Sequence, residues 1–369
     1  MVTQSIIGAD NPLGIYSIDY LEFCTHNINE SKLSQLFYSL GMGVKAHSQN
    51  GQQLLFSQGQ IRFLLTQGQA SSSNQNDVVA NHAYKYYQDH GEGVSTMAFL
   101  VENAEYALAE AKRRGAQEVM PLETIETAQG IFRRARIQGF GDVHNEFVER
   151  PRALFHPDFV ENEIDPLERP IQVRMARIDH LTNNVPKGEM KKWVEFYQKI
   201  FGFVVSRYFD IKGLKTGLLS EVVQLKNGNV IIPINEPEVD NGKSQIQEYL
   251  DLHKGAGVQH IAMTTPKIIE TVADLQSRGI KFLSIPHTYY QDIKKRGINV
   301  EEDLSQLEER QLLVDGDDKG YLLQNFTQSC VGPLFFEIIQ RKNHNGFGEG
   351  NFKALFDSIE RDQMQRGYL

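Results

Sequence analysis

The feature that most constrains the fold is an internal repeat, in which one order of predicted elements occurs twice along the chain. In the first copy, a strand beginning at Ile18-Asp19-Tyr20 precedes a helix over 33–40 and two apolar strand-like runs. In the second copy, a strand beginning at Ile178-Asp179-His180 precedes a helix over 190–200 and two similar runs. These runs lie at 54–56 and 61–65 in the first copy, and at 218–225 and 230–234 in the second.

The later part of each copy repeats as well. The segment 91–98 (GEGVSTMA) aligns with 255–262 (GAGVQHIA). Each is followed by a predicted helix that ends in Arg-Gly, over 104–115 and over 267–279. Units of one helix with several strands, paired into two halves, predict an α+β fold of curled sheets. We therefore expect duplicated βαβββ modules that form two open-barrel domains, followed by a C-terminal helix.

The length of 369 residues fits two domains better than one core. Prolines concentrate in the segment 151–170, and proline removes a backbone donor and fixes φ, so we expect an extended connector there. The predicted division is an N-terminal domain at 1–155, a connector at 156–175 and a C-terminal domain at 176–369. The polar segment 67–77 is predicted to be a surface loop.

Charge and apolar content exclude several classes of partner. Lys and Arg total 38 against 47 acidic residues, a net charge of −9, which repels nucleic acid and anionic lipid. No run approaches the roughly 18 apolar residues of a membrane span, and no secretory leader is evident at the start. The two cysteines, Cys24 and Cys330, form no disulfide pattern, which favours a reducing cytoplasm.

Superposing the two copies shows where they differ in chemistry. The first copy has Tyr20 where the second has His180, and Thr96 where the second has His260. The apolar run around Glu337 matches a segment of the first copy that contains Glu146. The first copy therefore keeps at most one of three candidate ligands. We expect the second copy to hold a site and the first to be structural, without metal ligands.

Each candidate alone has an ordinary explanation. A single histidine in a strand is more often a hydrogen-bonded core residue, and Glu337 could pair with Arg341 or turn toward water. A carboxylate among apolar neighbours is costly, however, unless a cation or strong donors satisfy it. Together, two imidazoles and one carboxylate form the ligand set of the 2-His-1-carboxylate facial triad, which leaves metal positions open for a substrate and O2. Zinc in such a set would instead favour hydrolysis or lyase chemistry.

A predicted helix from Asn351 onward places Phe352, Leu355, Phe356 and Ile359 on one face. It either docks on the core or acts as a lid that is hinged on the preceding glycines. In the second case it would present Phe352 and Phe356 to a pocket. The histidines other than His180 and His260 lie mostly in polar or loop contexts, and we expect them to be solvated.

The second half resembles 4-hydroxyphenylpyruvate dioxygenase, a family of the vicinal oxygen chelate superfamily. The resemblance covers most of residues 175–360, and it is looser in the first half. The stretches that carry it are PINEP at 233–237, KSQIQ at 243–247, GAGVQH at 255–260, TYY at 288–290, LQNFT at 323–327, FEIIQR at 336–341 and GFGEGNFKALF at 346–356.

The resemblance implies that His180, His260 and Glu337 bind Fe(II), and that an aromatic α-keto acid chelates the ion. Loss of CO2 from 4-hydroxyphenylpyruvate would supply two electrons, and ring hydroxylation by O2 with migration of the side chain would give homogentisate, in tyrosine and phenylalanine catabolism. A homo-oligomer, either dimer or tetramer, is implied as well. The implied substrate-binding residues are Ser220, Asn235, Gln245, Gln259, Gln324, Phe326, Phe335, Phe352, Leu355 and Phe356.

Three alternatives remain open at this point. A 4-hydroxymandelate synthase shares the triad and the substrate but hydroxylates the side chain, so product analysis separates the two. An extradiol ring-cleaving dioxygenase shares the fold and ligands but usually needs a further acid-base residue near the metal. A metal-free binding module of the same fold predicts an eroded triad, and metal content tests it.

Overall fold

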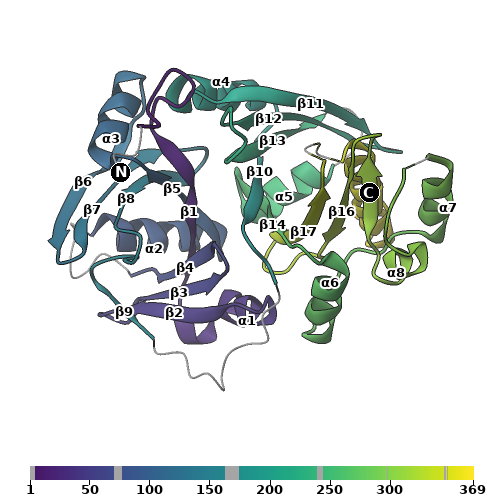
Figure 1. Ribbon diagram of the computed structural model, residues 1–369, viewed down its shortest axis with the longest axis horizontal. Helices are drawn as coiled ribbons and strands as arrows, with labels where there is room; N and C mark the ends of the chain where they lie inside the picture. Colours follow the sequence, from purple (N-terminus) through teal and green to yellow (C-terminus); the bar gives the residue numbers. More distant parts are fainter. Residues whose placement is uncertain are drawn as a thin grey trace.

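The computed structural model describes residues 5–69, 77–162, 174–238, 244–296, 298–344, 346 and 348–369. Within these ranges, the two halves of the chain lie side by side, and each is built on a strongly curled sheet (Figure 1). The described part of the first half forms a nine-stranded sheet in the order β6-β7-β8-β5-β1-β4-β3-β2-β9, and that of the second an eight-stranded sheet in the order β11-β12-β13-β10-β14-β17-β16-β15. The predicted fold class is confirmed.

The strands of the first sheet are β1 (Ile15–Thr25), β2 (Gly43–Ser48), β3 (Gln53–Gln58), β4 (Ile61–Gln67), β5 (Gly93–Val101), β6 (Glu118–Thr127), β7 (Gly130–Gln138), β8 (His144–Glu149) and β9 (Phe159–Glu161). Those of the second are β10 (Ile178–Asn184), β11 (Val204–Lys212), β12 (Gly217–Gln224), β13 (Ile231–Glu238), β14 (Gly257–Thr264), β15 (Leu313–Gly316), β16 (Tyr321–Phe326) and β17 (Phe335–Lys342).

The helices are α1 (Lys32–Ser39), α2 (Val78–His90), α3 (Ala104–Arg113), α4 (Met190–Phe196), α5 (Gln245–His253), α6 (Ile268–Ser277), α7 (His287–Arg296), α8 (Leu304–Glu309) and α9 (Glu349–Gln365), with a 3-10 turn at Ile28–Glu30 and a π-helical turn at Tyr197–Phe201. The C-terminal helix α9 thus begins two residues before the predicted Asn351. No helix within the described ranges is long and apolar enough to cross a membrane.

The central strands of the two sheets pair in the same register. In each half, the first strand runs antiparallel to one partner, which in turn runs parallel to a third strand. Because side chains alternate between faces with a period of two, equal registers place equivalent residues on the same face of each sheet. The equivalent pairs are Tyr20–Ala98 and His180–Ala262, Glu22–Thr96 and Thr182–His260, Ala98–Glu146 and Ala262–Glu337, and Arg136–Glu146 and Phe326–Glu337.

The main hydrophobic core runs through both halves. The rings of Phe63 and Phe336 lie 6.1 Å apart, and those of Phe99 and Phe201 lie 5.3 Å apart, so each half contributes aromatic side chains to the other. Burial of this apolar surface, at roughly 25 cal/mol per Å², holds the two sheets together. A second cluster joins Phe356 of α9 to strands β11 and β12.

Two predicted segments are only partly described, and a third prediction is wrong. The connector at 156–175 contributes the edge strand β9, which pairs with β2, while 163–173 lie outside the described residues. Most of the predicted loop, 70–76, also lies outside them. The prediction that the remaining histidines are solvated is wrong for His144, His156 and His253, which are buried because their rings pack against other aromatic or imidazole rings.

Candidate metal centre and adjoining cavity

Three adjacent strands bring the candidate ligands together. His180 lies on β10, His260 on β14 and Glu337 on β17, and these strands are neighbours in the second sheet. One ligand atom from each residue lies within 4.8 Å of the others. The Oε2 atom of Glu337 is 3.1 Å from Nε2 of His180 and 3.5 Å from Nε2 of His260. Among the described residues, this is the one group of His, Cys, Asp and Glu side chains with the geometry to hold a metal ion.

Both imidazoles are held through their outer nitrogen. Nδ1 of His180 lies 2.9 Å from a carboxylate oxygen of Asp179, and Nδ1 of His260 lies 3.0 Å from Oε1 of Gln259. Because a carboxylate or amide oxygen can only accept, each ring carries a proton on Nδ1, and Nε2 of each ring faces Glu337. Arg341 in turn donates two hydrogen bonds to Asp179, at 3.0 and 2.7 Å. This arrangement is the usual support of a metal-binding histidine.

Electrostatics at the site favour a cation. Burial alone would raise the pKa of Glu337, but the charge of His180 and hydrogen bonds from both histidines outweigh it and lower the pKa to about 2. Burial would lower the pKa of His180, but the Glu337 charge raises it to about 9. The buried carboxylate therefore stays ionised and needs a compensating positive charge, which protonated His180 supplies until a metal ion displaces that proton. A divalent cation between the three side chains fits that need, and the N,N,O donor set suits Fe(II).

A cavity with about 410 Å³ of space between protein atoms adjoins the three ligands. Apolar side chains from β11 to β13, β16 and α9 form most of its wall, together with a few polar groups. The hydroxyl of Ser220 and Oδ1 of Asn235 are buried and have no hydrogen-bond partner among the described residues. Besides the ligands, the cavity is lined by Thr182, Phe209, Ser220, Val222, Pro233, Asn235, Gln324, Phe326, Phe352 and Leu355.

Comparison with known proteins places the chain in a family. The family model described as hydroxyphenylpyruvate dioxygenase, N-terminal, matches residues 9–159, and that of the glyoxalase/bleomycin resistance protein/dioxygenase superfamily matches residues 177–303. The 4-hydroxyphenylpyruvate dioxygenase of Pseudomonas aeruginosa is 39% identical over 366 residues, covering 97% of each chain. The chain belongs to the 4-hydroxyphenylpyruvate dioxygenase family.

Other relatives are similar along much or all of their length. The 4-hydroxyphenylpyruvate dioxygenase of Dictyostelium discoideum is 42% identical over 294 residues, covering 76% of this chain and 80% of that one. A protein of Vibrio vulnificus named hemolysin VllY is 39% identical over 375 residues, covering 99% of each. Among solved structures, a mutant 4-hydroxymandelate synthase from Streptomyces coelicolor has 25% identity and a TM-score of 0.81, covering 95% of this chain and 99% of that one.

The structure brings most of the family-implied substrate residues to the cavity. Ser220, Asn235, Gln324, Phe326, Phe352 and Leu355 all line it. Gln245, Gln259 and Phe335 instead line a separate surface pocket between α5 and α9, and Phe356 packs into the core beneath α9. The roles of these residues in substrate binding stay predictions.

Sequence reasoning missed four members of the wall: Thr182, Phe209, Val222 and Pro233. Strand alternation was the available signal for three of them, and one of these, Thr182, lies two residues after His180 on β10. Val222 lies two residues after Ser220 on β12, and Pro233 two before Asn235 on β13, so each shares the face of a residue that the family pattern did identify. Phe209 pairs directly with Ser220 across β11 and β12. Its position could not be known before the strand register was.

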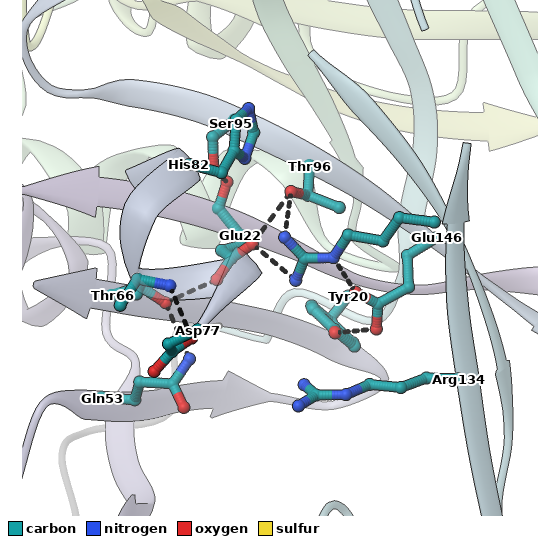
Figure 2. Close-up of polar contacts among 12 residues, drawn as sticks. Tyr20, Glu22, Gln53, Thr66, Asp77, His82, Ser95, Thr96, Arg134 and Glu146 are labelled. Atoms are coloured by element: carbon teal, nitrogen blue, oxygen red, sulfur yellow. Dashed lines mark hydrogen bonds and ion pairs between the residues drawn. The ribbon is translucent and has the colours of Figure 1, made fainter. Parts of the chain in front are cut away.

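The first half holds a cation of its own, Arg136, among the residues at the equivalent positions, of which Figure 2 labels Tyr20, Glu22, Thr96 and Glu146. The guanidinium of Arg136, at the register position of Phe326, lies 2.9 Å from Oε2 of Glu22 and donates a short hydrogen bond to Glu146. It also contacts the Thr96 hydroxyl, which donates to Glu22, while the Tyr20 hydroxyl donates to Glu146. The side chains of Arg136 and Glu146 are wholly buried. An arginine thus compensates the carboxylates of this half.

Proposed function

We infer that the protein converts 4-hydroxyphenylpyruvate and O2 to homogentisate and CO2, a step of tyrosine and phenylalanine catabolism. The observation that carries this inference is the buried triad of His180, His260 and Glu337, which opens on an aromatic-walled cavity in a chain that belongs to the 4-hydroxyphenylpyruvate dioxygenase family. The relatives of that name in bacteria and in Dictyostelium discoideum support the substrate.

Iron is the metal that we propose for this site, held by Nε2 of His180, Nε2 of His260 and Oε2 of Glu337. Fe(II) bound there supplies the redox chemistry that couples loss of CO2 from the keto acid to use of O2. Three protein ligands leave coordination positions for a bidentate keto acid and for O2. Zinc would satisfy the same carboxylate but has no redox chemistry, so it fits the family less well.

The cavity wall suits an aromatic keto acid. Phe209 and Phe352 meet edge to face with ring centroids 5.4 Å apart, and Phe326 stands at a right angle to His260 at 6.2 Å. We propose that Phe326 and Phe352 contact the substrate ring, which fixes its distance from the ligands and excludes water. The unpartnered oxygens of Ser220 and Asn235 are available to hydrogen-bond the polar end of the substrate.

The alternative with a specific observation behind it is 4-hydroxymandelate synthesis, because the Streptomyces coelicolor structure superposes over nearly the whole chain. The relatives from Pseudomonas aeruginosa and Dictyostelium discoideum have higher identity and carry the dioxygenase name. The two reactions share metal and substrate, so the regiochemistry depends on how the wall orients the ring. Product identity distinguishes them directly.

We also propose that the protein works as a cytoplasmic homo-oligomer. Two free cysteines within the described residues suit a reducing compartment. Strand β11 is an edge of the second sheet and exposes Val204, Val205 and Tyr208. Exposed apolar side chains on a sheet edge are typical of a surface that another chain covers. Light scattering on the purified protein measures the number of subunits.

The test of the proposed function is an assay of the Fe(II)-reconstituted protein with 4-hydroxyphenylpyruvate, in which O2 uptake is recorded and the product is identified by mass and retention. We expect homogentisate, with one CO2 released per O2 consumed. 4-Hydroxymandelate would assign the alternative activity to the same site. Tight iron binding without O2 uptake would mean that the substrate is wrong.

A further inference from the structure

A chain of buried hydrogen bonds runs from the candidate metal ligand Glu337 to the start of helix α9. Nε2 of Gln324 donates to Oε1 of Glu337 at 2.8 Å, and Nδ2 of Asn351 donates to Oε1 of Gln324 at 2.8 Å. The Tyr289 hydroxyl lies 2.8 Å from Oδ1 of Asn351 and accepts the Val314 N–H at 2.7 Å. Glu337, Gln324 and Asn351 are at most 3% exposed.

The direction of this chain is fixed at its metal end. An ionised carboxylate can only accept hydrogen bonds, so the Gln324 amide must turn its nitrogen toward Glu337 and its oxygen toward α9. That oxygen then requires a donor, which is Nδ2 of Asn351. Oδ1 of Asn351 is left as an acceptor, and the Tyr289 hydroxyl, whose oxygen accepts the Val314 N–H, can donate its one proton there or to the Val314 carbonyl at 2.9 Å. Each amide thus has a single favourable orientation.

The same chain of hydrogen bonds determines which oxygen of the Glu337 carboxylate is free to bind a metal. The Gln324 amide occupies Oε1 of Glu337, whereas Oε2 faces Nε2 of both histidines. A carboxylate with one oxygen held in this way offers the other as a single ligand. A carboxylate released from the amide could use both oxygens and fill a coordination position that the keto acid or O2 needs.

The first turn of α9 packs closely against this chain of hydrogen bonds. Gly348, at the start of the helix, has φ +69°, and a Cβ there would lie 2.5 Å from Oε1 of Gln324. The N–H of Gly350 donates to Asp315 at 3.0 Å, which ties the same turn to β15. Phe352 and Leu355 of this helix line the cavity. The contacts that hold the first turn of α9 in place, and with it these two side chains, are therefore the contacts that orient the Gln324 amide.

We propose that Asn351 and Tyr289 are positioning residues, which orient the Gln324 amide so that Glu337 presents one oxygen to the metal, and which link the seating of α9 to that carboxylate. The proposal rests on the proposed function for its metal. It does not depend on the identity of the keto acid or of the product. Asn351 and Tyr289 do not themselves line the cavity, and Asn351 reaches the metal ligand Glu337 only through Gln324.

The test is equilibrium binding of Co(II), as a stable substitute for Fe(II), to apoprotein without keto acid. The variants are Asn351→Leu, Tyr289→Phe and the double variant. Loss of a supporting contact behind a metal ligand typically weakens metal binding about 10- to 100-fold, and we expect Asn351→Leu to fall in that range and Tyr289→Phe to weaken binding less. Because the residues act in series, the double variant should bind no more weakly than Asn351→Leu alone.

Tyr290→Phe is the matched control, because the Tyr290 hydroxyl is buried without a hydrogen-bond partner among the described residues. We expect it to leave Co(II) affinity unchanged. The visible absorption of bound Co(II) should weaken in Asn351→Leu, since a higher coordination number lowers its intensity, and amide exchange in the first turn of α9 should quicken. Should Asn351→Leu fail to fold, Tyr289→Phe decides the matter. Folded variants with wild-type Co(II) affinity and spectrum would overturn the proposal, even if homogentisate were still formed.

Discussion

The two halves of the chain compensate buried carboxylates in different ways at equivalent sheet positions. In the first half the positive charge belongs to Arg136 and is part of the fold, whereas the phenyl ring of Phe326 takes that position in the second half and contributes no charge. The carboxylate of the second half is therefore compensated either by protonated His180 or by a bound cation. The equivalent residues are Tyr20 and His180, Glu22 and Thr182, Thr96 and His260, Arg136 and Phe326, and Glu146 and Glu337.

This difference shows what a repeated module needs in order to become catalytic. A guanidinium held by Glu22, Thr96 and Glu146 carries a positive charge but cannot bind a substrate or O2 as a metal ion does. A metal ion held by three side chains keeps coordination positions for them. The two halves share one other feature, a bidentate Asp–Arg pair: Asp19 with Arg150, and Asp179 with Arg341. In both halves this pair joins the first strand to the residues at the end of the third, but only in the second half does its aspartate also hold a candidate metal ligand, His180.

The largest contrast is expected between Glu337→Gln and Glu146→Gln, which remove one charge at equivalent positions. Glu337→Gln should abolish O2 uptake and reduce bound iron to background, because a neutral amide is a poor metal ligand. Glu146→Gln should keep wild-type activity and iron content, since it touches no ligand. Atomic absorption and an O2 electrode measure both. Iron lost from Glu146→Gln as fully as from Glu337→Gln, in a folded protein, would break the comparison.

The next largest effect concerns stability. Arg136→Met leaves Glu22 and Glu146 without their cation, and removing one partner of a buried ion pair costs about 3–5 kcal/mol. Arg133→Met on the same strand is the control, because its partly exposed pair with Glu149 should contribute less than about 1 kcal/mol. Urea unfolding measures both differences.

A rescue sharpens this prediction. Adding Glu22→Gln and Glu146→Gln to Arg136→Met removes the unpaired charges, and much of the lost stability should return, because a buried ionic cluster can be replaced by neutral groups. Equal destabilisation by Arg136→Met and Arg133→Met would show that the arginine does not have the compensating role assigned to it.

A third effect lies where the halves meet. The His253 ring stacks on His90 and on Tyr249, and its Nε2 lies 3.0 Å from the Tyr86 hydroxyl. His90 also contacts Asp142. Burial and the His90 charge lower the pKa of His253 to about 4. The pKa of a histidine in the unfolded chain is about 6.5. Between about pH 6.5 and about pH 4, the unfolded chain therefore binds a proton on His253 that the folded protein does not bind.

Stability should accordingly fall as the pH drops from about 6.5 to about 4, by on the order of 3 kcal/mol for His253 alone. Urea unfolding at pH 7 and pH 5 measures the fall, and comparison with His253→Gln isolates this residue from the other buried histidines. A smaller fall in the variant is the expected result. An equal fall in both proteins would mean that the contact between the halves does not depend on a neutral imidazole.

The smallest effect concerns the shared Asp–Arg pairs. Asp179→Asn should weaken metal binding about 10- to 100-fold, because Asp179 fixes the ring proton of His180. Asp19→Asn should leave metal affinity unchanged, because the neighbouring residue in the first half is Tyr20, which binds no metal. Isothermal titration of the two apoproteins with Co(II) compares them. Equal losses would indicate that the pairs act on the fold alone.

The duplicated fold and the triad were predictable from the sequence because strands impose a strict periodicity. Aligning 91–98 with 255–262 gives the position of His260, and aligning the first strands of the two copies gives that of His180. The pairing of Ala98 with Glu146, and of Ala262 with Glu337, confirms the suspected equivalence of the two glutamates. Neither conclusion required knowledge of tertiary contacts.

What the sequence did not predict depends on contacts across the sheet. Arg133, Arg134 and Arg136 lie in one short run, and nothing in that run says which guanidinium is buried between two carboxylates. The hydrogen bonds that link Gln324 to Asn351 and Tyr289 join residues that lie far apart in the sequence. Strand β9 consists of three residues next to prolines, too short a run to give a periodic signal.

The most direct test of the comparison is anomalous diffraction from crystals grown with Co(II) or Fe(II), recorded on both sides of the metal absorption edge. We predict one strong anomalous peak per chain, bounded by Nε2 of His180, Nε2 of His260 and Oε2 of Glu337, and no peak beside Glu22 and Glu146. A peak in the first half, or none between the three side chains of the second, would contradict the account.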